Sequence, residues 1–491
     1  MVYPLLRAYF KLALGVFYRR REVVGAAHVP AEGPLLVVAN HPNALVDGLL
    51  IASALERPLS LTAKSTLAEA PIVGALFRAA HVVPIHRARD VGAGADPSRN
   101  RDSLAEIQRR LAAGGALLLF PEGQSHNDPA MRRFRHGAAQ LALDYVASGN
   151  QGQLRILPVG LHNEAKTRYR SRTLLRFGPA MVVGAWRKAH LTARPRELTQ
   201  ALRDRLEGLA LEFADRGEEV LLHRAAELLE LRGEAPPTLG RPGPSLAERV
   251  ALIERLQTGY RTLRSAEEEA AESPSGEPES ATASHLEDGD ATRIELESEH
   301  DAPARPSTAP PYEVSELATR VVAFRRRLRT LGIAPRELHI SMHPLRVLRF
   351  ALREGLLLVV GLPLAAWGYL NHALPYLATR LAARRLSAKP DQVASYAVFG
   401  ALVLFPVAYL LQLGFAWWLL PARWAALYTV ALPLTGLVAL RLGTRLGAMR
   451  RRIRAFLRLA SDAREREALV AESHGIVDEI RGLAEALERP S

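Results

Sequence analysis

The stretch Val37-Val38-Ala39-Asn40-His41-Pro42-Asn43-Ala44-Leu45-Val46-Asp47 decides the fold of the N-terminal part of this chain. Its apolar start is typical of a buried strand. Pro42 disfavours the helical conformation for His41, so the histidine is expected on the turn that leaves the strand. Pro42 itself suits the first turn of a helix, which then carries Asp47. The stretch therefore predicts an imidazole at the rim of a sheet, with a carboxylate able to reach it.

Such a pair has two interpretations. A general base needs one ring nitrogen to take a proton while a carboxylate holds the other in its tautomer, and His41 with Asp47 can provide this arrangement. The same two residues also fit a histidine that caps a helix beside a surface aspartate. The stretch alone favours neither interpretation.

Composition limits the class of protein. At 491 residues the chain has room for two or three domains. It contains no cysteine, which excludes disulfides and thiolate metal sites. The net charge is +13, but residues 265–305 hold 13 acids and two arginines, a local net of −11, so the rest of the chain carries +24. A basic chain of this kind meets nucleic acid or an anionic membrane surface, and the apolar C-terminal segments favour the membrane.

Residues 22–195 alternate between patterns typical of strands and of helices. Strands are predicted at 35–39, 81–85, 116–120 and 154–159, and helices at 44–56, 99–113 and 136–148. This alternation predicts an α/β fold with a mixed or mainly parallel sheet flanked by helices, followed by a helical region and C-terminal membrane helices.

The whole chain divides into segments of different character. We expect an amphipathic interfacial helix over 1–24, the α/β domain over 25–195, a helical region over 196–264, a disordered acidic linker over 265–311, a basic helical segment over 312–345, membrane-associated helices over 346–445 and a helical tail over 446–491. For the first helix, packing on the domain's own core is an equal alternative. For the linker, the alternative is folding back onto the basic surface.

Three uncharged segments predict membrane association. Residues 355–379, 392–422 and 424–440 lack charged side chains, and a membrane span needs about 20 apolar residues. The first segment is interrupted by Pro363 and Pro375, so we expect either a re-entrant hairpin or a kinked span. Arginines flank every segment, so the positive-inside rule does not fix the orientation. The alternative is a buried helical bundle of a soluble protein.

Three more segments lie at the ends of predicted strands, and the second of them continues into a helix start. Pro84-Ile85-His86-Arg87 places an arginine where it can hold a phosphate by two parallel hydrogen bonds, or can form a plain surface ion pair. Phe120-Pro121-Glu122-Gly123 leaves a glutamate at the carboxyl end of a strand, where open α/β sheets place their sites. Arg135-His136-Gly137 then supplies cations at a helix start, which favours anions. Leu157-Pro158-Val159 enters a turn near the same rim.

Taken in this order, the four segments resemble the glycerolipid acyltransferase family, of the bacterial lysophosphatidate and glycerol-3-phosphate acyltransferase type. The resemblance covers roughly residues 25–190. The layout with a helical insert and C-terminal apolar helices is similar to the fungal dual-substrate glycerol-3-phosphate and dihydroxyacetone-phosphate acyltransferases. There are two departures: five residues instead of four separate His41 from Asp47, and Gln124-Ser125-His126 stands where many members have Thr-Arg-Ser.

The resemblance implies a membrane-associated enzyme of phospholipid (phosphatidic acid) biosynthesis. An acyl chain passes from acyl-coenzyme A or acyl carrier protein to a hydroxyl of glycerol-3-phosphate or 1-acylglycerol-3-phosphate. His41 is the implied base and Asp47 its partner. The implied substrate-binding residues are Asn43, Lys64, Arg87, Glu122, Gly123, Ser125, Arg135 and Gly137.

The resemblance also implies a role for each group of these residues. Lys64 and Arg87, with the arginines of 132–135, hold the acceptor phosphate, and Glu122 orients an acceptor hydroxyl or an arginine. Backbone amides near Gly123 hold the developing oxyanion. No metal or redox cofactor and no nucleic acid are expected. The partners are the lipid bilayer, the acyl carrier and the phosphorylated glycerol, with the catalytic domain on the cytoplasmic face.

Two other classes of function compete with this one. A serine hydrolase would use Ser125, but Gly123-Gln124-Ser125-His126-Asn127 lacks the second glycine of a nucleophile elbow. A non-catalytic membrane scaffold would not need His41, Asp47, Arg87 and Glu122 together.

Overall fold

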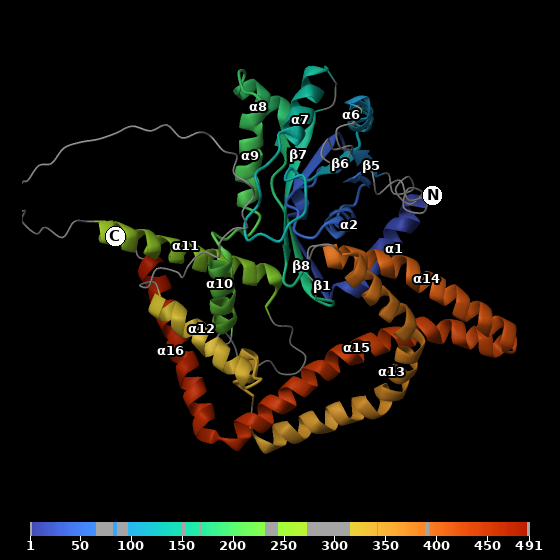
Figure 1. Cartoon of the computed structure of the whole chain (residues 1–491), viewed down its shortest axis with the longest axis vertical. Helices are drawn as coiled ribbons and strands as arrows, with labels where there is room; N and C mark the ends of the chain where they lie inside the picture. Colours follow the sequence, from blue (N-terminus) through green and yellow to red (C-terminus); the bar gives the residue numbers. More distant parts are fainter. Residues whose placement is uncertain are drawn as a thin grey trace, which may run out of the picture.

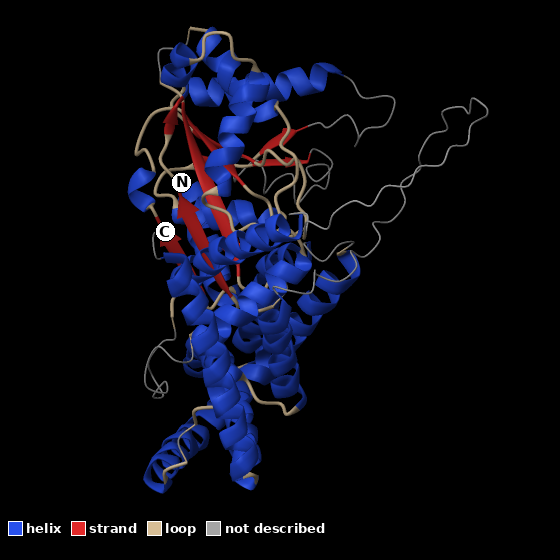
Figure 2. Cartoon of the chain, turned by 90° about the vertical axis from the view of Figure 1, so that its left-hand side faces the viewer, coloured by secondary structure: helices blue, strands red, loops and turns tan. Residues whose placement is uncertain are grey.

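The structure is a computed structural model that describes most of the chain. The described residues are 2–64, 82–85, 97–149, 153–166, 168–230, 244–272, 315–340, 342–387 and 392–488. Figure 1 shows an α/β part next to a set of long helices. The strands are confined to one end of the molecule, and the other end is helical throughout (Figure 2).

A seven-stranded mixed sheet forms the core of the N-terminal part. Its order is β1 (Arg20–Val24), β8 (Arg172–Phe177), β7 (Arg155–Asn163), β2 (Leu35–Ala39), β6 (Ala116–Leu119) and β3 (Leu59–Ser60), with β9 (Met181–Val182) paired to β7. β2 pairs in parallel with both β6 and β7, so the strand that leads to His41 lies inside the sheet. The pairing of β7 with β8 is antiparallel. A separate parallel pair joins β4 (Thr62–Lys64) to β5 (Val83–Ile85).

Helices cover both faces of the sheet, which explains why β2 reads as an uninterrupted apolar run. Leu35, Val37 and Ala39 belong to one buried cluster, together with α1 (Val2–Phe17) and α2 (Leu45–Ala54). Leu36 and Val38 belong to a second buried cluster. The helices of that second cluster are α6 (Pro97–Ala112), α7 (Gly137–Ala147) and α9 (Pro195–Glu207). The predicted α/β class with flanking helices is therefore confirmed.

The N-terminal segment differs from the expected helix over 1–24. α1 ends at Phe17, and Arg20–Val24 forms strand β1 at the edge of the sheet. Leu14 and Phe17 are buried in the core, so the core-packing alternative is right for this face of the helix. Leu5 and Leu12 remain exposed on α1. Charged side chains in β1 and β8 hid both strands from the sequence pattern.

The helical region after the sheet extends further than predicted. It contains α8 (Val183–Ala189), α10 (Arg216–Leu229) and α11 (Leu246–Glu272), so residues 265–272 continue a helix instead of starting the linker. The rest of the predicted linker, 273–311, lies outside the described residues. The basic segment forms α12 (Ser315–Thr330), which packs with α10 and the C-terminal α16 (Ala463–Glu488) around a third core.

The predicted membrane segments form three long helices, α13 (Pro344–Leu386), α14 (Val393–Leu419) and α15 (Ala422–Ser461). α13 runs unbroken through Pro363 and Pro375 and bends along its course (Figure 1), so the re-entrant hairpin is wrong. Among the described helices, α14 and α15 are long and apolar enough to cross a membrane. Only 11% and 28% of their apolar windows are buried, which disfavours the soluble-bundle alternative.

Polar side chains join these three helices to one another. Arg445 of α15 donates to both oxygens of Glu354 of α13, at 2.8 and 2.7 Å. Tyr428 donates to Asn371 at 2.6 Å and to Gln412 of α14 at 3.1 Å. Polar groups on apolar helices are expected to face their neighbours in this way, because lipid cannot satisfy them.

A close backbone approach fixes the sheet against the helical region, and it can be tested by substitution. A methyl group added to Gly160 of β7 would lie 2.2 Å from the carbonyl oxygen of Leu209. We expect Gly160→Ala to lower the free energy of unfolding by about 1–3 kcal/mol, because the backbone must shift. Urea unfolding of the detergent-solubilised protein measures this.

The matched control is Gly184→Ala in α8, where the added methyl group meets nothing within 4 Å. We expect this variant to be as stable as the parent or more stable by up to about 1 kcal/mol, because alanine favours the helix. Equal stability of the two variants would contradict the proposed approach of Leu209 to the sheet.

Candidate active site

His41 and Asp47 meet as the sequence predicted. His41 follows the end of β2, and Asp47 lies in the first turn of α2. The Nδ1 atom of His41 lies 3.0 Å from Oδ2 of Asp47. The aspartate side chain is fully buried, while 14% of the histidine side chain is exposed. The contact occupies Nδ1, so Nε2 is the ring nitrogen that can meet a substrate proton.

The loop between the two residues accommodates five residues by folding around the carboxylate. The backbone amide of Asn43 donates to Oδ2 of Asp47 at 2.7 Å. Ala44 takes φ 51° and ψ −138°, a conformation that residues other than glycine rarely adopt. The extra residue is thus absorbed as local backbone strain, and the contact of His41 with Asp47 is kept.

The electrostatics of Asp47 depend on these donors. Burial raises the pKa of Asp47 above its ordinary value, and the hydrogen bond and charge of His41 act in the opposite direction. The Asn43 amide also lowers the pKa. Burial therefore disfavours the charged form of Asp47, and His41 with the Asn43 amide opposes this effect.

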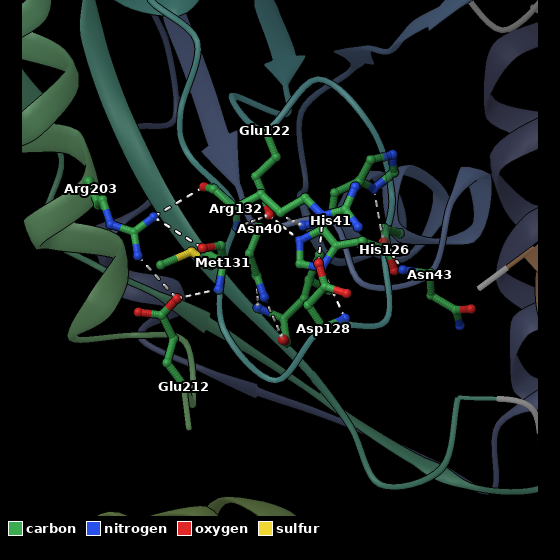
Figure 3. A network of polar contacts seen from close by, with 12 residues as sticks. Asn40, His41, Asn43, Glu122, His126, Asp128, Met131, Arg132, Arg203 and Glu212 are labelled. Atoms are coloured by element: carbon green, nitrogen blue, oxygen red, sulfur yellow. Dashed lines mark hydrogen bonds and ion pairs between the residues drawn. The ribbon is translucent and has the colours of Figure 1, made fainter. Parts of the chain in front are cut away.

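Glu122 holds the backbone around His41. The residue follows β6, and its side chain is fully buried. One oxygen accepts from the His41 amide at 2.8 Å, and the other accepts from the Arg132 amide at 2.9 Å and contacts the His126 ring (Figure 3). The sequence predicted a contact of Glu122 with an acceptor hydroxyl or an arginine, and the contact with an arginine is made to the backbone amide of Arg132. Phe120 stacks on the His41 ring at 3.7 Å between centroids.

Asn40 was not assigned a role from the sequence. Its amide donates to the Leu161 carbonyl at 3.1 Å and accepts from the Leu161 amide at 2.7 Å. These two bonds join the ends of β2 and β7, next to His41. The signal in the sequence was its position at the end of a buried strand, directly before the histidine.

Two other predicted site residues, Gly123 and Asn43, form contacts within the protein. The Gly123 amide donates to Phe120 at 3.0 Å, so this amide is not a donor for an oxyanion. Gly123 itself has φ 74°, as its tight turn requires. Asn43 is fully buried and its side chain donates to Tyr18 at 3.3 Å.

The structure describes the side chains of only some of the cations that were predicted to bind phosphate. Arg135 is exposed and lies across Gly123, and Arg132 donates to Asp128 at 2.6 Å. Lys64 ends β4, but its side chain lies outside the description, as does the whole of Arg87. Gly137 begins α7, and Ser125 lies on the same loop as Glu122.

The His41 ring forms part of the wall of two cavities. A polar cavity of about 300 Å³ lies between the strand ends and helices α10 and α11, and its wall includes Glu122, His126, His162, Asn163 and Arg249. His41 also lies in the wall of a narrow apolar cavity, together with Phe10, Leu49, Leu61, Phe120 and Phe399. A polar and an apolar cavity therefore both border the residue of the candidate base.

The polar cavity contains buried groups without partners in the described part of the chain. These are Nε2 of His162 and both amide atoms of Asn163. Buried polar atoms are normally hydrogen-bonded, so these three atoms are exceptions among the described residues. Burial, with the nearby His223, lowers the pKa of His162 to about 3. Among the described residues, no cluster of three or more His, Cys, Asp or Glu side chains is arranged to hold a metal ion.

Comparison with known proteins connects this geometry with a family. Residues 20–162 match the family model described as Acyltransferase. An uncharacterized acyltransferase of Schizosaccharomyces pombe is 23% identical over 39% of this chain and 41% of that protein. Glycerol-3-phosphate O-acyltransferase 2 of Saccharomyces cerevisiae is 30% identical over 21% of this chain and 14% of that protein. Lysophosphatidylcholine acyltransferase 2 of Rattus norvegicus is 34% identical over 24% of this chain and 21% of that protein.

These alignments cover less than half of the length of each relative. Among solved structures, the 1-acyl-sn-glycerophosphate acyltransferase PlsC of Thermotoga maritima is 20% identical and aligns with 42% of this chain and 77% of its own, at a TM-score of 0.33. The resemblance predicted from the four motifs is confirmed at the level of the family.

The neutral state of His162 predicts a pH effect on stability. Its folded pKa of about 3 lies below the ordinary 6.5, so the unfolded chain binds a proton that the folded chain does not. This contribution to stability is present above pH 6.5 and is lost as the pH falls toward 3, at up to about 1.4 kcal/mol per pH unit. We expect His162→Gln to flatten the loss of unfolding free energy between pH 6.5 and 5.

The control is His190→Gln, because His190 is exposed and lies outside both cavities. This variant should follow the parent at every pH. Equal slopes for the parent and His162→Gln would show that His162 is accessible to protons in the folded state.

Proposed function

We propose that this chain is a membrane-associated glycerolipid O-acyltransferase, because residues 20–162 match the family model described as Acyltransferase. It would move an acyl chain from acyl-coenzyme A or acyl carrier protein to glycerol-3-phosphate or 1-acylglycerol-3-phosphate, in the synthesis of phosphatidic acid. The observation that carries the proposal is the His41–Asp47 pair in the wall between a polar and an apolar cavity. Relatives named as glycerol-3-phosphate and lysophosphatidylcholine acyltransferases support this substrate class.

The pair acts as a general base. Nε2 of His41 takes the proton of the acceptor hydroxyl while the hydroxyl oxygen attacks the thioester carbonyl. Asp47, at Nδ1, orients the ring and stabilises its charged form. The tetrahedral intermediate then expels the thiolate, which receives the proton from the imidazolium. An ester and a thiol result, without a covalent enzyme intermediate.

The surroundings of His41 keep the ring in place for this step. Phe120 stacks on one face of the His41 ring. Glu122 accepts a hydrogen bond from the backbone amide of His41. Positioning of this kind reduces the motion that a reacting group must lose in the transition state. We therefore propose that the main role of Glu122 is to position His41, in preference to a direct contact with the acceptor.

The acceptor phosphate requires cations near the His41 ring. Arg132 already pairs with Asp128, which leaves Arg133 and Arg135 from this group of arginines. We propose Lys64 and Arg87 as their partners, since an arginine can bind phosphate oxygens in pairs. No metal or redox cofactor enters the proposed reaction.

The proposed setting is the membrane. Helices α14 and α15 are candidate spans, and α14 contributes Phe399 to the apolar cavity. An acyl chain that enters from the lipid would reach His41 through this side. We propose that the domain with the sheet lies on the cytoplasmic face, where acyl-coenzyme A is found.

The general base is tested by His41→Ala and Asp47→Asn in the purified, detergent-solubilised chain. We expect each to lower kcat for acyl transfer by about 10²–10⁴-fold. Asp47→Asn should keep the fold, because the variant removes a buried charge. Release of free thiol is measured with glycerol-3-phosphate, dihydroxyacetone phosphate and lysophosphatidate as acceptors, and His190→Gln is the control. Parental activity of His41→Ala would exclude the proposed base.

The hydrolase alternative is tested in the same assay without an acceptor. A serine hydrolase would release free fatty acid from the donor and would lose this activity in Ser125→Ala. We expect little hydrolysis by the parent, because the proposed mechanism uses the acceptor hydroxyl and no serine nucleophile.

A further inference from the structure

A serine from the apolar helix α14 is bonded to the loop that carries the His41–Asp47 pair. Ser395 is 3% exposed. Its hydroxyl donates to the Asn43 carbonyl at 2.9 Å and accepts from the Val46 amide at 3.1 Å. One hydroxyl thus binds the residue before Ala44 and the second residue of α2.

The start of α2 needs such a partner. The first amides of a helix have no acceptor within the helix, and a Ser, Thr, Asp or Asn at the N-cap normally supplies one. The N-cap residue here is Ala44, which forms no side-chain cap and has a strained backbone. Ser395 supplies the missing acceptor from another part of the chain, and Asp47 is the next residue of the helix.

The position of Ser395 is fixed by the packing of α14. Ala394, Val398 and Leu402 lie on one face of α14 and belong to the same buried cluster as β2, α1 and α2. Tyr9 of α1 donates to the Leu402 carbonyl at 2.6 Å. The start of α14 is therefore part of the core of the α/β domain.

Phe399 follows Ser395 by one helical turn, so the two side chains project from the same side of α14. Phe399 lines the apolar cavity together with Phe10 of α1 and the His41 ring. Among the described residues, the wall of this cavity is apolar except for His41 and Thr62. Such a wall suits the hydrocarbon part of a substrate and excludes its polar parts.

We propose that α14, far beyond the residues that match the family model, completes the active site. Ser395 is a positioning residue that holds the loop between His41 and Asp47 in place. Phe399 closes the acyl-chain site and limits the acyl groups that it accepts. The inference rests on the proposed acyl transfer and adds to it that a candidate membrane helix sets the geometry of the base.

The first experiment removes the Ser395 hydroxyl from the full chain. We expect Ser395→Ala to lower kcat about tenfold with little change in KM for either substrate, because the reacting groups lose alignment. The acid limb of the pH profile of kcat/KM should move to lower pH, since Asp47 stabilises the charged imidazole less well. Ser395→Thr keeps a hydroxyl and should restore most of the activity.

The control is Thr435→Val, which removes a buried hydroxyl from α15. The Thr435 hydroxyl donates within its own helix, to Ala431 at 2.8 Å. We expect parental activity and a similar thermal-unfolding midpoint for this variant and Ser395→Ala. Parental kcat in Ser395→Ala would overturn the proposal, and so would an activity loss explained by less folded protein with an unmoved pH profile. An inactive parent chain would instead refute the proposed function.

The second experiment changes the size of Phe399. We expect Phe399→Ala to shift the preference among acyl-coenzyme A donors toward longer chains, and Phe399→Trp to shift it toward shorter chains, each by at least fivefold in the ratio of kcat/KM. Phe415→Ala, on an exposed part of the same helix, is the control and should keep the parental preference. An unchanged preference in both Phe399 variants would show that α14 does not shape the acyl site.

Discussion

A carboxylate that is fully buried at the start of a helix stays ionised only if hydrogen-bond donors and a cation surround it. Asp47 is in this position, and the geometry around β2 supplies what it needs. His41 contributes a ring nitrogen and Asn43 an amide, and both depend on the conformation of one short loop. The strain at Ala44 is part of this arrangement, because it turns the chain back toward the carboxylate.

The conformation of this loop depends on contacts with other parts of the chain. Glu122 bonds the His41 amide, Asn40 joins the end of β2 to β7, and Ser395 bonds both sides of Ala44. These contacts come from four different elements that meet at the carboxyl ends of parallel strands, where α/β sheets commonly carry their sites. His41 therefore borders both a polar and an apolar cavity, and this is the observation on which the proposed acyl transfer to a hydrophilic acceptor rests.

The apolar helices are connected with this site, and they do more than attach it to a lipid surface. One face of α14 packs in the same core as β2, while the greater part of its length is exposed and apolar. A helix with both properties can bind the membrane and hold the α/β domain in one orientation to it. Pairing of Arg445 with Glu354 and the contacts of Tyr428 connect α14 and α15 with α13.

The sequence by itself determined the central elements, because local patterns encode them. Burial on both faces gave β2 its apolar run, and Pro42 with Asp47 marked the start of α2, so the pair and its family resemblance were predictable. β1 and β8 were missed, since their charged residues are accommodated by ion pairs such as Arg172 with Glu164. Only the tertiary structure decided that Asn40, Ser395 and Phe399 lie next to His41 or its loop, because contacts between residues more than a hundred positions apart leave no spacing in the sequence. Binding of the acceptor phosphate by Lys64 and Arg87 stays a prediction from the motifs.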